Sequence, residues 1–384
     1  MREKKKRILF LWGAGIVLPP LLIGLLYVLQ RFLISYPAIG EAYARGPFKF
    51  LSYLPSRLSS LVPISITEVL CLTAALASPF LIAWFILRIV RSIRQKKGRK
   101  FFFGKARILT WGLFAMYAFF MLFHGINYTR RPLEESLGFG QRTYTVEELG
   151  EVYIWVILQI NEARTKSFED ENGVIAYPGG MNVFWDEAQR HYRDAASIFP
   201  SLQGNVGRPK PVAASRYWSY TNIVGLYDPF LCECNVNKAT TFTEIASSAF
   251  HEMSHLNGYA VENNANLASM LIRMNCDKPE IRYSGFSDAL PLIEEDFVKA
   301  FNGNSDVIRQ VLEQVPLCDG FYRDWAARVE FWDSINPPPI VETVSNNVND
   351  SFLKVNQQKE GVQSYHVQPS VVADYYYTYV KPQE

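Results

Sequence analysis

The sequence predicts an α+β, mainly helical protein, with three N-terminal transmembrane helices followed by one large domain. Three uncharged apolar runs occupy residues 8–30, 69–87 and 108–126. Each is close to the roughly 20 residues with which a helix crosses a bilayer. After them, helical patterns dominate and only short stretches are rich in β-branched and aromatic residues. The aromatic content of 14% also suits a chain that is anchored at membrane interfaces.

The first apolar run has an alternative interpretation as a signal peptide, because Met1–Arg7 is basic. The run is longer than a usual signal core, no clear cleavage site follows, and two more runs come later, so we interpret it as a span. A buried hairpin is the alternative for the other two runs, but uncharged runs of this length fit poorly in a soluble core. Residues 1–127 are therefore the predicted membrane domain.

The basic residues orient these spans. Met1–Arg7 carries five Lys or Arg and Arg88–Arg107 carries nine, whereas the intervening segment Arg31–Ser65 carries four. Cytoplasmic loops are enriched in Lys and Arg, so the N-terminus and the second loop are expected in the cytoplasm. Three crossings then place residues 128–384 outside the cytoplasm, as the extracytoplasmic domain of a multi-pass cell-membrane protein.

The external block is large enough for a substantial core. Helices are expected over residues 146–163 and 182–197, and strands over 212–220, 223–227 and 233–237. From Phe242 onward the pattern is mostly helical. The whole-chain net charge is only +2, which indicates no nucleic-acid partner.

Five cysteines occur, and four of them lie in the external block, where disulfides can persist. At least one disulfide is expected there, although the sequence does not choose among the possible pairings. The alternative is a Cys-x-Cys zinc site at Cys232 and Cys234, but no second pair has matching spacing. Cys71 lies in the second apolar run and is simply a small apolar residue.

The segment with the clearest chemistry is a predicted helix that begins near Thr241 and stops near Gly258. Thr241 and Glu244 have the spacing of a capping box, and glycine is typical just past a helix end. Within this helix His251 and His255 are four residues apart, so both imidazoles face the same side and can bind one ion. An exposed helix with solvated side chains is the alternative.

Glu252 follows the first histidine and is the expected general base of a zinc-dependent hydrolase. Peptidase zinc sites usually have three protein ligands, and no third histidine follows at a suitable distance. Glu262 is the nearest carboxylate, in a second predicted helix over residues 261–272, and is the expected third ligand. Alternatively, Glu262 is simply an acidic residue in the first turn that interacts favourably with the helix dipole. Asn266, one turn further on, could bond a ligand side chain.

Five motifs follow one another in the external block: Gly225–Phe230, Glu233–Asn237, His251–His255, Gly258–Ala260 and Glu262–Asn266. Together they resemble an uncharacterised family of bacterial membrane proteins that pair a few N-terminal spans with a zincin-like domain of gluzincin type. The stretch over 351–365 also resembles the C-terminal segment of that family. The resemblance implies a zinc metallopeptidase fold for residues 128–384.

The resemblance also bears on single residues. Asn264 stands where relatives have a second carboxylate, so zinc affinity would be weakened if that carboxylate were the ligand. Glu233 is implied to lie in a strand near the site, where it could bind substrate or merely cap a turn. Tyr365 and His366 are candidate donors to a developing oxyanion, the alternative being ordinary packing or surface positions.

The expected function is hydrolysis of a peptide or protein substrate by a zinc peptidase whose other partner is the lipid bilayer. One alternative is a non-catalytic membrane sensor or assembly factor that keeps the zincin fold, as Asn264 suggests. Catalysis within the membrane is a weaker alternative, because His251 lies far beyond the third apolar run.

Overall fold

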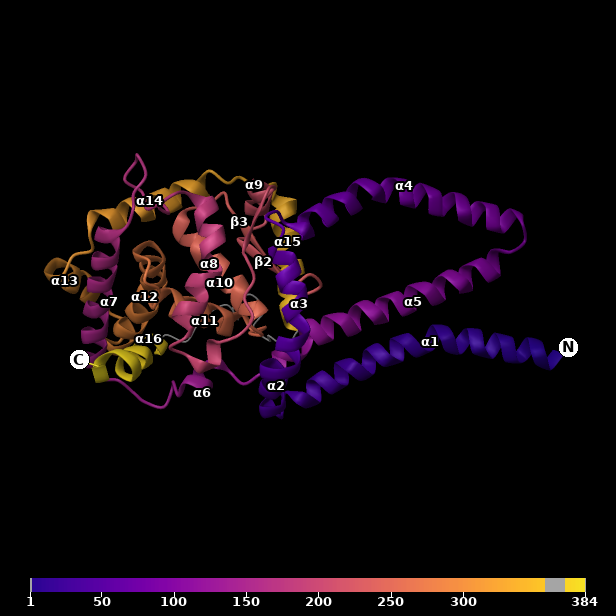
Figure 1. Cartoon of the computed structure of the whole chain (residues 1–384), viewed down its shortest axis with the longest axis horizontal. Coiled ribbons are helices and arrows are strands. Elements are labelled where there is room, and N and C mark those ends of the chain that lie inside the picture. The colour runs from indigo at the N-terminus through magenta and orange to yellow at the C-terminus, as the bar shows by residue number, and fades with distance from the viewer. Residues whose placement is uncertain (1, 356–369, 384) are drawn as a thin grey trace.

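The computed structural model describes residues 2–355 and 370–383 and consists of an arm and a globular part (Figure 1). The arm contains the helices α1 (Arg2–Leu33), α4 (Ile66–Arg94) and α5 (Gly98–Phe123). Within the described residues, these are the three helices long and apolar enough to cross a membrane. The three expected apolar helices are therefore confirmed, although α4 and α5 extend further into their basic flanks than the apolar runs indicate.

The surface of the arm is mostly without protein cover. In the most apolar window of each helix, only 11%, 0% and 11% of the residues are buried. The helices α1 and α5 pack side by side, and Trp111 Nε1 donates to the Gly15 carbonyl oxygen across 3.0 Å. The N-terminus and the turn between α4 and α5 both lie at the far end of the arm (Figure 1). The two basic segments thus share one end, opposite the globular part.

The connection from α1 to α4 is folded against the globular part. It contains α2 (Pro37–Tyr43), the π-helical turn η1 (Ala44–Phe48) and α3 (Lys49–Ser60). Asn205 Nδ2 donates to the Lys49 carbonyl oxygen at 2.5 Å and to Ser52 Oγ at 2.9 Å. This segment therefore forms the base of the arm.

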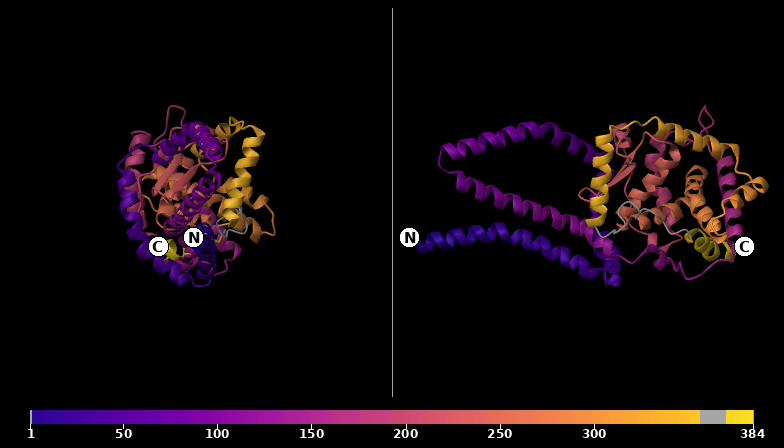
Figure 2. Two further views of the ribbon diagram at one scale, coloured as in Figure 1. Left: turned by 90° about the vertical axis from the view of Figure 1, so that its right-hand side faces the viewer. Right: turned by 180° about the vertical axis from the view of Figure 1, so that it is seen from behind.

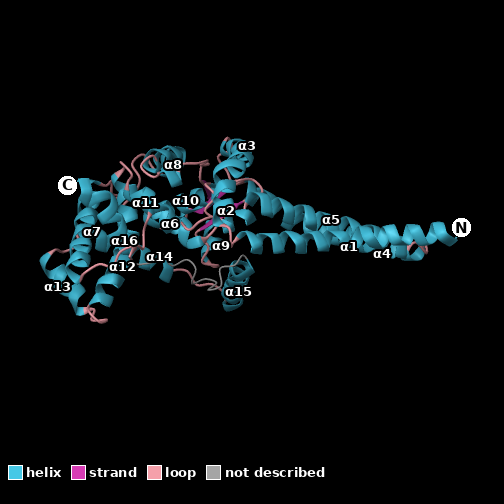
Figure 3. Cartoon of the chain, turned by 90° about the horizontal axis from the view of Figure 1, so that it is seen from below, coloured by secondary structure: helices cyan, strands magenta, loops and turns pink. Residues whose placement is uncertain are grey.

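The described sheet has three strands in the order β1-β3-β2. The central strand β3 (Glu233–Asn237) is buried throughout, pairs in parallel with β1 (Lys210–Val212), and pairs antiparallel with β2 (Gly225–Asp228). The strands lie near the base of the arm (Figure 3). Because β2 is an edge strand, one side of its backbone is left for contacts with other elements.

Helices pack around this sheet and form the core. The helices α10 and α11 pack against each other and against α12, and α12 lies along α7. The helix α7 begins at the capping box of Thr145 and Glu148. The core helices are α7 (Val146–Lys166), α8 (Met181–Ala196), α10 (Phe242–Leu256), α11 (Glu262–Met274) and α12 (Pro279–Ala300).

The other elements cover this core or connect its parts. They are η2 (Gly125–Thr129), α6 (Leu133–Leu137), η3 (Pro200–Leu202), α9 (Ser215–Ser219), α13 (Asp306–Gln314), α14 (Asp319–Asp333), α15 (Pro339–Val355), α16 (Val371–Tyr375), η5 (Tyr376–Val380) and η6 (Lys381–Gln383).

Three local expectations are wrong. The strand expected over 212–220 ends at Val212, because the chain then turns into α9. Thr241 does precede α10, but its hydroxyl makes no cap bond and lies 3.1 Å from Thr243 Oγ1, while the Glu244 carboxylate accepts from Arg328 and Trp332. The expected disulfide is not formed. All five cysteines lie in the described part of the chain and are free: Cys71, Cys232, Cys234, Cys276 and Cys318.

A buried carboxylate joins the arm to the sheet. Glu233 on β3 accepts from the backbone N–H groups of Ile66 at 2.9 Å and Thr67 at 2.7 Å, which open α4. It also pairs with Lys210 Nζ, and both side chains are fully buried. In the opposite direction, Glu68 of α4 accepts from the N–H groups of Ala213 and Ala214. The first turn of α4 is thus bonded into the sheet from both sides.

Burial alone would raise the pKa of Glu233, but Lys210, Thr67 and Ile66 outweigh burial and hold the pKa below its ordinary value. A carboxylate with a lowered pKa stabilises the folded state above its ordinary pKa, and this contribution is lost as the pH falls through the folded-state value. The junction is therefore intact at neutral pH and weakens in acid.

We expect Glu233→Ala to destabilise the protein by about 3–5 kcal/mol, because it leaves the Lys210 ammonium buried without a partner. Thermal unfolding in detergent, followed by a fluorophore that reacts with the buried thiols, measures the effect. Combining Glu233→Leu with Lys210→Met should restore the part of the loss that comes from the unpaired ammonium, but not the part that comes from the N–H groups of Ile66 and Thr67. The exposed pair Glu295–Lys299 provides the control, since Glu295→Ala should cost less than about 1 kcal/mol. Equal melting of the two single variants would contradict this role for Glu233.

Candidate metal centre

Helix α10 carries His251, Glu252 and His255, the first three residues of the candidate site. Its opposite face is held in the core by Ile245, Ala249 and other apolar side chains that are fully or almost fully buried. Since the two histidines are one turn apart, both imidazoles leave the helix on the same side, where their rings meet edge-on with centroids 4.6 Å apart. The expected pairing of the two imidazoles on one helix face is present in the structure.

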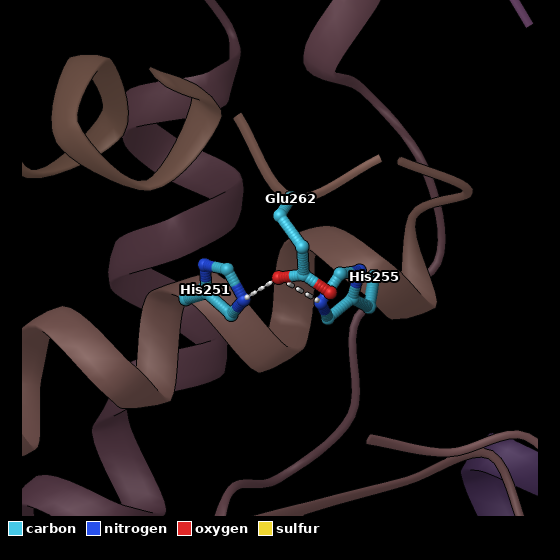
Figure 4. Close-up of side chains that lie close together, drawn as sticks. All are labelled: His251, His255 and Glu262. Atoms are coloured by element: carbon cyan, nitrogen blue, oxygen red, sulfur yellow. Dashed lines mark ion pairs between the residues drawn. The ribbon is translucent and has the colours of Figure 1, made fainter. Parts of the chain in front are cut away.

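A sharp turn brings Glu262 to these histidines. Helix α10 ends at Leu256, Gly258 adopts a φ of +90°, and α11 begins at Glu262. Oε2 of Glu262 lies 3.1 Å from Nε2 of His251 and 3.4 Å from Nε2 of His255 (Figure 4). One donor atom from each of these three residues lies within 4.8 Å of the other two.

Backbone and arginine contacts fix this turn. Nδ1 of His255 lies 2.7 Å from the carbonyl oxygen of Tyr259, and donation there leaves Nε2 directed toward Glu262. Arg130 donates to the Asn257 carbonyl oxygen at 3.1 Å, and its guanidinium lies 3.8 Å from the centroid of the Tyr259 ring. Arg130 is in turn paired with Glu41 at 2.7 Å, on α2. The base of the arm therefore supports the turn that carries the third donor.

The charges at the centre are strongly coupled. Burial opposes the charged form of His255, but Glu262 and Glu252 outweigh burial and raise its pKa to about 9. Burial likewise opposes the carboxylate of Glu262, yet His255 and His251 hold the pKa of this carboxyl well below its ordinary value. The centre thus holds an ionised carboxylate against a protonated imidazole, and a cation that binds there would displace the imidazole proton.

This donor set fits zinc. Two imidazole nitrogens and one carboxylate oxygen form the ligand set of a known class of catalytic zinc sites. His251, His255 and Glu262 could therefore hold the ion. The set lies on α10 and α11 in the globular part, outside the three candidate membrane spans.

Glu252 points to the other side of this centre, toward the edge strand β2. It is almost fully buried, and its Oε2 has no hydrogen-bond partner among the described residues. Burial raises the pKa of Glu252, and the charges of His251 and His255 oppose that rise. A Cβ atom at Gly225 would overlap both Oε1 of Glu252 and Oγ of Ser248. Only glycine lets the edge strand approach this carboxylate so closely.

The centre opens into a cleft of about 1770 Å³. One wall is the edge strand β2 with the residues on either side of it, and α10 forms the floor. Segments of α11, α12, α13, α14 and α15 and the C-terminal end of α5 complete the lining. The cleft is thus built from parts of the chain that are far apart in sequence.

The structure places the other candidate residues as follows. Asn266 lines the same cleft. Asn264 accepts at Oδ1 from the Leu133 N–H at 3.1 Å, so its side chain has a structural partner. Glu233 does not line the cleft and instead holds the first turn of α4. Tyr365 and His366 lie outside the described residues.

Sequence reasoning missed His124, which belongs to none of the motifs. The imidazole of His124 meets that of His255 with ring centroids 5.8 Å apart, and it lies 5.7 Å from the ring of Tyr227. No spacing in the sequence links residue 124 to residue 255, so only the fold shows this contact. Gly225 lies within one of the quoted motifs, and a glycine at the edge of a strand is a signal for close approach.

We expect the purified protein to bind about one zinc ion per chain, because three suitable donors converge. Metal analysis should show the zinc lost in the double variant His251→Ala plus His255→Ala and strongly reduced in Glu262→Gln. Asn264→Ala provides the matched control on the same helix and should keep the ion. If Asn264→Ala lost the zinc and Glu262→Gln kept it, Glu262 would not be the third ligand.

Comparisons with known proteins place the chain in a family without giving it an activity. A family model described as "Protein of unknown function (DUF3810)" matches residues 43–371, which is most of the chain. No curated protein and no solved structure matches it. The match includes the second and third arm helices, the sheet, and the helices that carry the histidines and Glu262. The chain therefore belongs to the DUF3810 family.

Proposed function

We propose that this protein is a membrane-anchored zinc peptidase with a zincin-like domain outside the cytoplasm. The observation that carries the proposal is the convergence of His251, His255 and Glu262 beside the buried, unpartnered oxygen of Glu252. A structural metal site needs four protein ligands, whereas the described residues supply three, the number found in catalytic sites that keep a position for water or substrate.

Zinc bound by these residues would supply Lewis-acid chemistry, which polarises a peptide carbonyl and makes water more acidic. Glu252 is placed to accept the proton of the attacking water as the new carbon–oxygen bond forms. It can then deliver this proton to the amine as the carbon–nitrogen bond breaks. Burial that raises the pKa of Glu252 suits a group that must both take and return a proton.

The shape of the cleft favours a peptide as substrate. The edge strand β2 lines the cleft directly beside Glu252. An extended peptide can add to such an edge through main-chain hydrogen bonds. The scissile bond would then lie along the strand, near the metal-binding residues.

The proposed orientation of the protein in the membrane rests on the distribution of its basic residues. The far end of the arm holds both basic segments, and the globular part lies at the other end (Figure 1). By the rule that basic loops stay in the cytoplasm, this arrangement favours a globular domain on the outer side.

The non-catalytic alternative rested on Asn264. The hydrogen bond of Asn264 Oδ1 to the Leu133 N–H gives this side chain a structural role, which favours Glu262 over position 264 as the third ligand. Complementation distinguishes the two functions, since full activity of Glu252→Gln in cells would favour the sensor or assembly factor.

We expect Glu252→Gln to keep its zinc and to lose hydrolysis by about 10²–10⁴-fold, the usual contribution of a general base. The measurement uses the full-length protein in detergent with a mixture of fluorogenic peptides, alongside metal analysis. Wild-type rates in the variant would rule out Glu252 as the base.

Gly225→Ala should also lower hydrolysis, because the new methyl group displaces the Glu252 carboxylate. Zinc content should stay unchanged, since Gly225 does not contact the donor set. Gly112→Ala is the matched control, because a Cβ there meets nothing within 4 Å. Equal peptide cleavage by the two glycine variants would show that the position of the edge strand does not matter.

A further inference from the structure

The candidate metal centre lies directly against the outer end of the third arm helix. Helix α5 ends at Phe123, and the next residue, His124, contacts the ring of His255. One turn back, the ring of Phe119 stacks on Phe230 with centroids 5.4 Å apart and an interplanar angle of 14°. Phe230 lines the cleft, as do Phe120 and His124. If α5 spans the bilayer, the cleft begins where the bilayer ends.

Helix α3 marks the same plane independently. Its polar side chains Ser52 and Ser56 are buried against the protein, whereas Phe50 is 83% exposed and Leu54 is 61% exposed. This pattern is the inverse of a helix that packs on a soluble core, and it is typical of a helix that lies on a lipid surface. Residues 34–65 connect the end of α1 to the beginning of α4. Because both helices belong to the arm, this connection, which includes α3, stays at the base of the arm.

Helix α15 lies across the base of the arm on the side opposite α3 (Figures 2 and 3). Ser345 donates to the Thr221 carbonyl oxygen at 3.1 Å, which connects α15 to the chain ahead of β2. Ile340 is 73% exposed and Val344 is 54% exposed, and both line the cleft. The cleft therefore has an apolar rim in the plane that α3 and the end of α5 define.

We propose that the substrate is the juxtamembrane segment of a membrane-anchored polypeptide, which enters the cleft along the bilayer surface. This inference rests on the proposed peptidase function and adds the class of substrate. A chain anchored in the same bilayer is confined to the plane of the cleft, so its effective concentration is high without tight binding. The backbone edge of β2 beside the centre suits a peptide rather than a lipid acyl chain, which has nothing to pair with it.

The position of the cleft can be tested without any activity. Spin labels at Val344→Cys and Leu54→Cys, in a Cys71→Ser plus Cys318→Ser background, report contact with bilayer or water in phosphatidylcholine nanodiscs. Both labels should be accessible to oxygen and protected from a water-soluble nickel chelate. Arg309→Cys on α13, far from the arm (Figure 1), is the control and should show the opposite pattern. Equal exposure to the chelate at residues 344 and 309 would overturn the proposal.

Cleavage sites test the substrate class. New N-termini in membranes and extracts of the source cells are compared between the wild-type protein and Glu252→Gln. Termini that depend on Glu252 should cluster within about 20 residues of a transmembrane span or lipid anchor, a reach of a few tens of ångströms along an extended chain. Termini scattered through soluble proteins would overturn this inference and leave the peptidase intact. No difference between the two strains would instead overturn the peptidase proposal itself.

Discussion

The turn between α10 and α11 is the constraint on which the candidate site depends. Two histidines on one helix offer only two donors, and the third arrives only if the chain reverses within a few residues. Gly258 permits the reversal through its positive φ, and a Cβ there would also lie 3.2 Å from Phe48. Arg130 then holds the turn by contacting the Asn257 carbonyl oxygen and the ring of Tyr259. Without this turn, Glu262 would not reach the imidazoles.

The contacts of Arg130 also connect the base of the arm to the turn that carries the candidate site. Arg130 follows the last arm helix closely in sequence, and its partner Glu41 lies between the first two arm helices. The buried pair of Glu233 and Lys210 provides a second connection, from the sheet to the first turn of α4. The globular part and the base of the arm thus share one network of buried polar contacts, and the site lies between these two connections.

Much of this architecture follows from patterns along the chain. Uncharged apolar runs identified the three arm helices, and the spacing of His251 and His255 identified the helix that carries the site. Glu262 is the nearest carboxylate in the sequence, and in the structure its Oε2 lies 3.1 Å and 3.4 Å from the Nε2 atoms of the two imidazoles. These expectations share a basis, because each depends on local periodicity or on short separation in sequence.

The errors have the opposite cause. The β-branched and aromatic residues after Val212 favour a strand, but the local turn into α9 prevails. Glu244 has the spacing of a capping residue, yet distant partners on α14 engage its carboxylate. His124 and Glu233 gain their positions from segments more than a hundred residues away. Tertiary contacts of this kind leave no signal in the spacing of a single sequence.

The junction at Glu233 has a consequence for biogenesis. Its carboxylate is bound by N–H groups that are free only because they open the helix α4, so the partner exists only once that helix has formed. The arm helices precede β3 in the chain and leave the ribosome first. The hydrogen bonds of Glu233 can therefore form only once the first turn of α4 has formed, so completion of the sheet depends on that helix end.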